Sequence, residues 1–254
     1  MHDAPSAPQL PALRPPEQPT LPTTTAEVNE LFSFMAEAEL RFDTLRMRVL
    51  DRRYTTHGEE LETHEIWVRH PGSAKVITTY GEAGGNAREY DSWMTDGTTV
   101  RTFNARAKIA TNRRVPLRPV GSDDPDLPGR SRVYLPGTVR PAETLADTFV
   151  HPHGYCRNVL ATGVISRRGT QIIAGREAIL LRVDHPRTSH VLTDRPDHWL
   201  EVGVDYQTGL ILLLAEHVGD RLTRHAQVTA TALDEPITDD VFRLHISSDT
   251  RTLY

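Results

Sequence analysis

The sequence has a single cysteine, no long apolar run and no strong excess of either charge. Because Cys156 is the only cysteine, the chain cannot form an internal disulfide bond. The longest apolar run, GLILLLA at 209–215, has the length of a strand. A membrane-spanning helix needs about 18 apolar residues or more. We therefore expect peripheral rather than integral membrane contact at most.

Charges and motifs exclude several classes of function. The 29 basic and 34 acidic residues give a net charge of -5, spread along the chain, so no basic stripe points to nucleic acid. The chain contains no G-x-S-x-G, no phosphate-binding glycine loop and no H-E-x-x-H. We therefore expect neither an enzyme nor a cofactor. No charged-then-apolar signal region begins the chain, so the sequence as written predicts a cytoplasmic protein.

Proline marks two segments that differ from the rest. Residues 1–23 are proline-rich and are expected to form a disordered lead. Residues 24–250 are expected to form one domain, interrupted by an excursion at 116–147 that is dense in Pro, Gly and Asp. Long connections of this kind are usually functional or disordered. One short helix is predicted at its end, over 141–149.

The domain begins with a predicted helix. Thr24 and Glu27 have the spacing of a capping box, in which two side chains satisfy free N–H groups at a helix start. Leu31, Met35 and Phe42 then recur on one face. This helix needs an apolar surface to pack against.

From Leu45 onward the apolar period changes to two, which is typical of strands with one dry face. Short turn signals such as Asp96-Gly97 separate many of these runs, and this favours antiparallel neighbours. The predicted strands are 45–49, 64–70, 74–81, 90–95, 98–104, 161–169, 170–175, 177–185, 199–206, 209–218 and 222–233. A sheet of about ten strands has to curl. We predict an α+β, mainly β fold: a single antiparallel sheet forming a half-open barrel, with the N-terminal helix in its concave mouth.

One stretch, HPHGYC at 151–156, contains residue types that bind metals. His151, His153 and Cys156 are weak candidates for three zinc ligands, and a cysteine beside histidines could also form a nucleophilic pair. Pro152 and Gly154 favour a loop, and the chain has 12 histidines, so such a cluster carries little information. We expect no metal here, and we expect replacement of both histidines to leave the fold intact.

Several segments, in this order, resemble the LolA/LolB-like family of lipoprotein carriers and the N-terminal domain of RseB/MucB-type sigma factor regulators. They are the N-terminal helix leading into 45–49, WVRHPG at 67–72, Asp96-Gly97, AGREAILLRV at 174–183, WLEVGVDYQTGLIL at 199–212 and EPITDDVFRL at 235–244. The resemblance implies a half-open barrel around an apolar cavity, and an extracytoplasmic location.

The resemblance also implies a function, namely non-enzymatic binding of a lipid or a lipidated protein or peptide. The alternative is a regulatory or sensor module of the RseB type, which binds a protein partner such as an anti-sigma factor. Candidate lining residues come from the dry faces of the predicted helix and strands. They are Met35, Phe42, Ile66, Val68, Val76, Trp93, Val100, Phe103, Leu181, Val202, Val204 and Leu212.

Overall fold

The computed structural model describes residues 25–70, 72–81, 90–96, 98–114, 144–186, 195–244 and 250–253. The predicted lead, Thr24, Gly97 and residues 116–143 of the excursion lie outside these ranges, so the predictions made for them stay predictions. The prediction of a single domain over residues 24–250 also stays a prediction. Within the described residues, no helix has both the length and the apolarity needed to cross a membrane.

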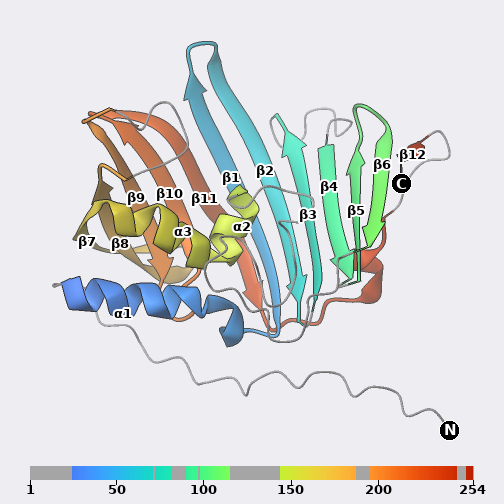
Figure 1. The fold of residues 1–254 in the computed structure, drawn as a ribbon, viewed down its shortest axis with the longest axis horizontal. Helices are drawn as coiled ribbons and strands as arrows, with labels where there is room; N and C mark the ends of the chain where they lie inside the picture. Colours follow the sequence, from blue (N-terminus) through green and yellow to red (C-terminus); the bar gives the residue numbers. More distant parts are fainter. Residues whose placement is uncertain are drawn as a thin grey trace, which may run out of the picture.

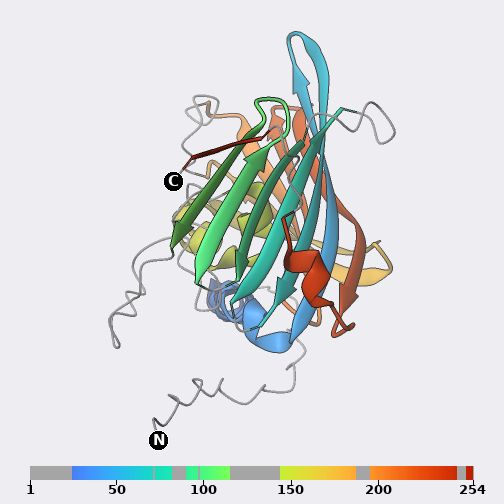
Figure 2. The same ribbon diagram turned by 90° about the vertical axis from the view of Figure 1, so that its right-hand side faces the viewer.

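The strands of the described residues form one sheet in the order β12-β6-β5-β4-β3-β2-β1-β11-β10-β9-β8-β7 (Figure 1). Their bounds are β1 Thr44–Thr55, β2 Gly58–Arg69, β3 Ser73–Tyr80, β4 Tyr90–Asp96, β5 Thr99–Asn104, β6 Ile109–Arg114, β7 Val164–Ile173, β8 Arg176–Asp184, β9 His198–Asp205, β10 Ile211–Val218, β11 Arg221–Leu233 and β12 Arg251–Leu253. The sheet twists and curls without closing, as the side view shows (Figure 2). The predicted fold class is confirmed.

Strand β1 lies in the middle of the sheet and joins its two halves. It pairs antiparallel with β2 on one edge and with β11 on the other. On one half the chain continues through β2–β6; on the other it runs from β7 to β11. In β1 the side chains of Leu45, Met47 and Val49 are buried and alternate with exposed arginines. The period of two seen in the sequence therefore reflects one face turned toward the core.

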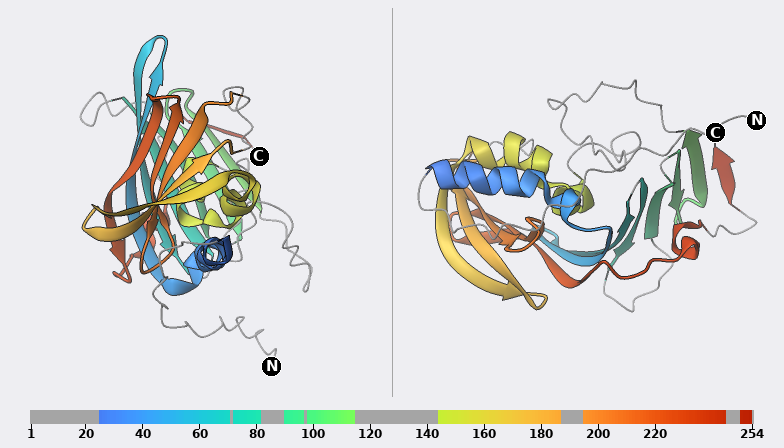
Figure 3. Two further views of the ribbon diagram at one scale, coloured as in Figure 1. Left: turned by 90° about the vertical axis from the view of Figure 1, so that its left-hand side faces the viewer. Right: turned by 90° about the horizontal axis from the view of Figure 1, so that it is seen from below.

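The helices gather on the concave side of the curled sheet (Figure 3). They are α1 Thr25–Ala36, η1 Ala38–Arg41, α2 Leu145–Val150, α3 Pro152–Asn158 and η3 Leu160–Thr162, whereas η5, Asp239–Phe242, lies beside β3 and β4. Leu31 and Met35 of α1 and Phe149 of α2 are buried in the same core as the inward side chains of the sheet. The apolar stripe of the predicted first helix thus packs against the concave face.

The structure differs from the sequence predictions at three strands. The two strands predicted at 161–169 and 170–175 are one strand, β7, which continues through Gly169 because a register shift and a φ of +123° accommodate the glycine there. Strands β6 and β12 were not predicted. Neither has an alternating apolar pattern, and β12 pairs parallel with β6 over only three residues.

We predict that Leu181→Asp prevents folding, whereas Ile172→Asp in the same hairpin does not. Leu181 is fully buried and Ile172 is 66% exposed, so the same type of change buries a carboxylate only at position 181. The loss of unfolding free energy is expected to exceed about 4 kcal/mol for Leu181→Asp and to stay within about 0.5 kcal/mol for Ile172→Asp. Urea unfolding followed by circular dichroism measures both, and a stable Leu181→Asp variant contradicts the assigned face of β8.

Candidate functional site

The candidate site is the concave face of the sheet, where the strand register lines up apolar side chains from both halves. Met47 of β1 lies beside Ile66 of β2, which lies beside Val76 of β3, which lies beside Trp93 of β4. On the other half, Leu181 of β8 lies beside Val202 of β9. Helices α1–α3 cover part of this face and share its core.

Eleven of the twelve predicted lining residues belong to this single buried core. All twelve are at most 7% exposed, so their side chains pack against protein atoms in the described structure. Eleven of them therefore lie in an apolar interior, as the dry faces of the predicted helix and strands imply. Their role as ligand contacts stays a prediction.

The exception is Phe103, which lies on the opposite face of the sheet. It pairs with Ser92, whereas Trp93 pairs with Thr102, and adjacent positions of a strand point to opposite faces. Phe103 instead stacks edge-on against Tyr90, with ring centroids 5.7 Å apart. The odd spacing between Val100 and Phe103 is incompatible with one shared face in a regular strand, so this residue could have been excluded from the sequence.

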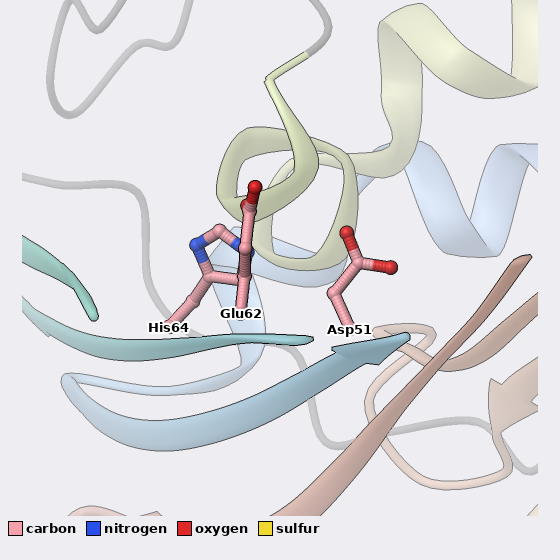
Figure 4. A group of neighbouring side chains, drawn as sticks. All are labelled: Asp51, Glu62 and His64. Carbon is pink, nitrogen blue, oxygen red and sulfur yellow. The ribbon is translucent and has the colours of Figure 1, made fainter. Parts of the chain in front are cut away.

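Toward the end of β1 the same concave face changes from apolar to charged. Asp51 is fully buried, and Arg224 of β11 donates to both of its oxygens, from Nε and Nη2, at 2.9 Å each. Arg53 Nη2 lies 3.1 Å from Asp51 Oδ2 and 3.4 Å from Glu62 Oε2. His64 Nδ1 lies 3.0 Å from Thr78 Oγ1. Figure 4 shows Asp51, Glu62 and His64 extending to the same side of the sheet.

Asp51, Glu62 and His64 also satisfy the distance condition for a metal site, since their possible ligand atoms lie within 4.8 Å of one another. However, the Arg53 guanidinium bridges the two carboxylates, and Arg224 takes both oxygens of Asp51. The cluster thus carries its own cations. It fits an intramolecular ion-pair network better than a metal centre, because a metal ion would have to displace two arginines.

The charges of this network shift the pKa values of its members. Burial alone would raise the pKa of Asp51, but the hydrogen bonds and charge of Arg224, together with Arg53, hold it below its usual value. For Glu62 burial prevails over Arg53 and raises the pKa. Burial would lower the pKa of Arg224, but Asp51 and Glu216 raise it. Asp51 and Arg224 therefore form a firmly charged pair at neutral pH.

The HPHGYC stretch is a helix start and not a loop. His151 is the N-cap of α3, and Pro152 occupies the first turn, where its missing N–H group costs nothing. His151 Nε2 lies 2.6 Å from Glu39 Oε2 of η1, and both side chains are buried. Burial would lower the pKa of His151, but the charge of Glu39 and the hydrogen bond to it raise it.

The other two candidate ligands face different surroundings. His153 is exposed, whereas Cys156 is buried with its Sγ 3.7 Å from Met35 Sδ. Burial raises the pKa of the Cys156 thiol, so it stays protonated and is a poor nucleophile and ligand. His151, His153 and Cys156 therefore do not converge on one metal position, and His151 instead ties η1 to α3.

A separate hollow lies at the tips of β3, β4 and β5. It has a volume of about 380 Å³ and is lined by Tyr80, Tyr90, Asp91, Asn104 and Arg106. Asp91 accepts hydrogen bonds from Tyr80 Oη at 2.8 Å and from Asn104 Nδ2 at 2.7 Å. This hollow was not predicted from the sequence, and the hydrogen-bonded side chains of Tyr80, Asp91 and Asn104 in its wall distinguish it from the apolar concave face.

Comparison with known proteins gives matches of structure only. No family model matches the sequence. No curated protein matches either. Among solved structures, MucB has a TM-score of 0.51 at 18% identity, over 87% of this chain and 64% of MucB. The complex of Pseudomonas aeruginosa MucA and MucB has a TM-score of 0.50 at 18% identity, over 86% of this chain and 61% of the matched chain. A LolA superfamily protein, NE2245 from Nitrosomonas europaea, has a TM-score of 0.32 at 9% identity, over 85% of this chain and 97% of the matched chain.

The two MucB matches show the fold of the chain. The chain shares the architecture of MucB, which confirms at the level of fold the resemblance to RseB/MucB-type domains found in the sequence. Both structures that contain MucB reach a TM-score of 0.5. The chain spans less than two thirds of the length of MucB. At 18% identity, this similarity establishes architecture and leaves function to be argued from the site.

We predict that Arg224→Met lowers the unfolding free energy by about 3 kcal/mol, because it leaves Asp51 buried with one arginine fewer. Arg52→Met is the control. Arg52 and Glu59 are each 44% exposed, so loss of their pair should lower the unfolding free energy by less than about 1 kcal/mol.

The folded pKa of Asp51 lies below its unfolded value near 4. Its contribution is therefore complete above about pH 4 and is lost as the pH falls further. Urea unfolding of both variants between neutral and acidic pH measures this, and equal losses refute the network.

The buried pair corrects the expectation from the sequence that His151 can be replaced without effect on the fold. We predict that His151→Ala destabilises the fold by about 2 kcal/mol, because Glu39 loses a buried charged hydrogen-bond partner. His153→Ala should be neutral within about 0.5 kcal/mol, since His153 is exposed. The raised pKa of His151 means that its pair is complete below about pH 6.5 and weakens as the pH rises through the folded pKa. The difference between the two variants should therefore shrink at alkaline pH. Thermal unfolding of both across pH measures it, and an unchanged His151→Ala variant contradicts the buried pair.

Proposed function

We propose that this chain is a non-enzymatic binding protein that holds an apolar ligand, such as a lipid or the acyl chain of a lipidated protein or peptide. The ligand lies between the concave face of the sheet and helices α1–α3. The supporting observation is that, within the described residues, this apolar face is covered by short separate helices and not by a second sheet. Such a cover can part from the sheet without breaking any strand pairing.

The burial of the lining residues sets how a ligand enters. Leu181, Val202 and Met35 are fully buried, so a ligand reaches them only when the helices move outward. Each methylene that is then buried contributes about 0.8 kcal/mol, which offsets the helix contacts that are lost. This driving force has no preferred direction, so no sharp sequence motif is needed. The absence of any such motif in the sequence is consistent with this mode of binding.

A second candidate is a regulatory module that binds a protein partner. Two observations favour it. The side chains of the described core pack against one another, and one of the similar MucB structures is a complex with MucA. The partner of MucB is a property of that protein, and for this chain it suggests only the kind of experiment to perform. In this candidate the covered apolar face has a structural role, and binding uses another surface.

A Met35→Cys variant tests whether α1 and α3 must separate when a ligand enters. Met35 Sδ lies 3.7 Å from Cys156 Sγ, so a cysteine at position 35 lies near Cys156, and oxidation that joins the two thiols would link α1 to α3. We expect the reduced variant to bind a fluorescent fatty acid and the oxidised variant to bind at least about tenfold more weakly, a loss of about 1.4 kcal/mol. Fluorescence titration measures binding, and thiol titration establishes how much disulfide has formed.

The wild-type protein, whose single cysteine cannot form this bond, is the control for oxidation itself. Equal binding by both forms of the variant contradicts entry of the ligand between α1 and α3. Absence of fatty-acid binding by the wild type, together with no extractable lipid in native mass spectrometry, favours the protein-partner candidate.

A further inference from the structure

The two ends of the sheet differ in strand pairing. At one end, β12 adds to β6 as a parallel strand, through Arg251, Thr252 and Leu253 paired with Ile109, Ala110 and Thr111. At the other end, β7 pairs with β8 along one edge, and no strand of the described residues pairs with its second edge. Strand β7 also approaches β11 and η3, but neither contact is a strand pairing, so the second edge keeps backbone groups with which an added strand can pair. The β12 pairing shows that this sheet accepts a short extended segment at an end.

Strand β7 also exposes apolar side chains. Val164 is 68% exposed and Ile172 is 66% exposed, and they lie near opposite ends of the strand. Strongly exposed valine and isoleucine on a strand with one unpaired edge favour pairing of that edge with another chain. Val164 pairs with Asp184 and Ile172 with Glu177, so the two side chains point to opposite faces of the sheet, and an extended segment laid along β7 would place one of its own side chains beside each of them.

The middle of β7 carries positive charge. Arg167 and Arg168 are exposed beside the register shift that precedes Gly169. A second copy of this chain, paired antiparallel with Arg167 of each copy opposite Arg168 of the other, would bring four arginines together, and like charges directly opposite each other are unfavourable. A segment with acidic residues at its centre would instead form cross-strand ion pairs. The charge therefore selects against self-association and in favour of an acidic partner.

We propose that the free edge of β7 is a docking site for an extended segment of a partner protein, which adds to the sheet as a further strand. The segment has acidic residues facing Arg167 and Arg168 and apolar residues beside Val164 and Ile172. Backbone hydrogen bonds provide the common part of the binding, and side chains provide the specificity. This site is distinct from the concave face and does not depend on the binding of an apolar ligand there.

The test uses two fluorescently labelled peptides as long as β7. In one, a central Asp-Glu pair is flanked by alternating Val and Thr; in the other, the central pair is Lys-Lys. Fluorescence polarisation should show that the full chain binds the acidic peptide at least about tenfold more tightly. Arg167→Glu combined with Arg168→Glu should reverse this preference. Hydrogen exchange should slow in residues 164–173 when the acidic peptide is bound.

The matched control is Arg113→Glu combined with Arg114→Glu. This pair is also exposed and lies on β6 at the other end of the sheet, beyond the residues that β12 covers. It makes the same change in net charge, so it should leave the peptide preference intact. Ile172→Asp should weaken the acidic peptide, because it places a carboxylate beside the acidic segment and removes an apolar contact.

Each outcome decides the proposal. The proposal is supported if Arg167→Glu with Arg168→Glu reverses the peptide preference, Arg113→Glu with Arg114→Glu does not, and hydrogen exchange slows in β7. Equal effects of both arginine pairs indicate general charge attraction and overturn it. No binding at millimolar peptide, or slower exchange only in other strands, also overturns it. A dimer of the free chain that Ile172→Asp dissociates would show that a second copy occupies this edge, and this too would overturn the proposal.

Discussion

The pairing of β1 with both β2 and β11 holds the two halves of the sheet together. One edge of β1 pairs with β2 from Thr44 to Thr55, and the other pairs with β11 from Leu45 to Arg53. Each half is otherwise a meander of neighbouring strands. The concave face, the helices that cover it and the continuity of the core all require this one strand to be paired on both edges.

The ion-pair network lies across the same seam and restricts its register. Asp51 comes from β1, Glu62 from β2 and Arg224 from β11. A slip of one residue along β1 would turn Asp51 to the convex face and bring Arg52 into the core, leaving Arg224 without its main partner. Buried ion pairs contribute little net stability, because the charges must leave water. This network therefore adds more to the uniqueness of the strand pairing than to its strength.

The sequence predicts the parts of this molecule that depend on local pattern. The alternation in β1 and the stripe through Leu31 and Met35 each need only one element to be recognised. The network could not be predicted in this way, because Asp51 and Arg224 meet only through the register of strands far apart in the chain. Nor could the Glu39–His151 pair, which joins η1 to α3. Strand β12 has too few residues to show a period, and a proline in the first turn made α3 resemble a loop.

The central position of β1 also determines the order in which the sheet can be completed during synthesis. Strands β2–β6 follow β1 directly, so that half can form through hairpins between neighbours while the chain is still being made. The opposite edge of β1 must wait for β11, which ends at Leu233. Until then a long central strand presents unpaired backbone groups to the crowded surroundings of the ribosome. The rate of elongation between β6 and β11 therefore sets how long the nascent chain is exposed to aggregation.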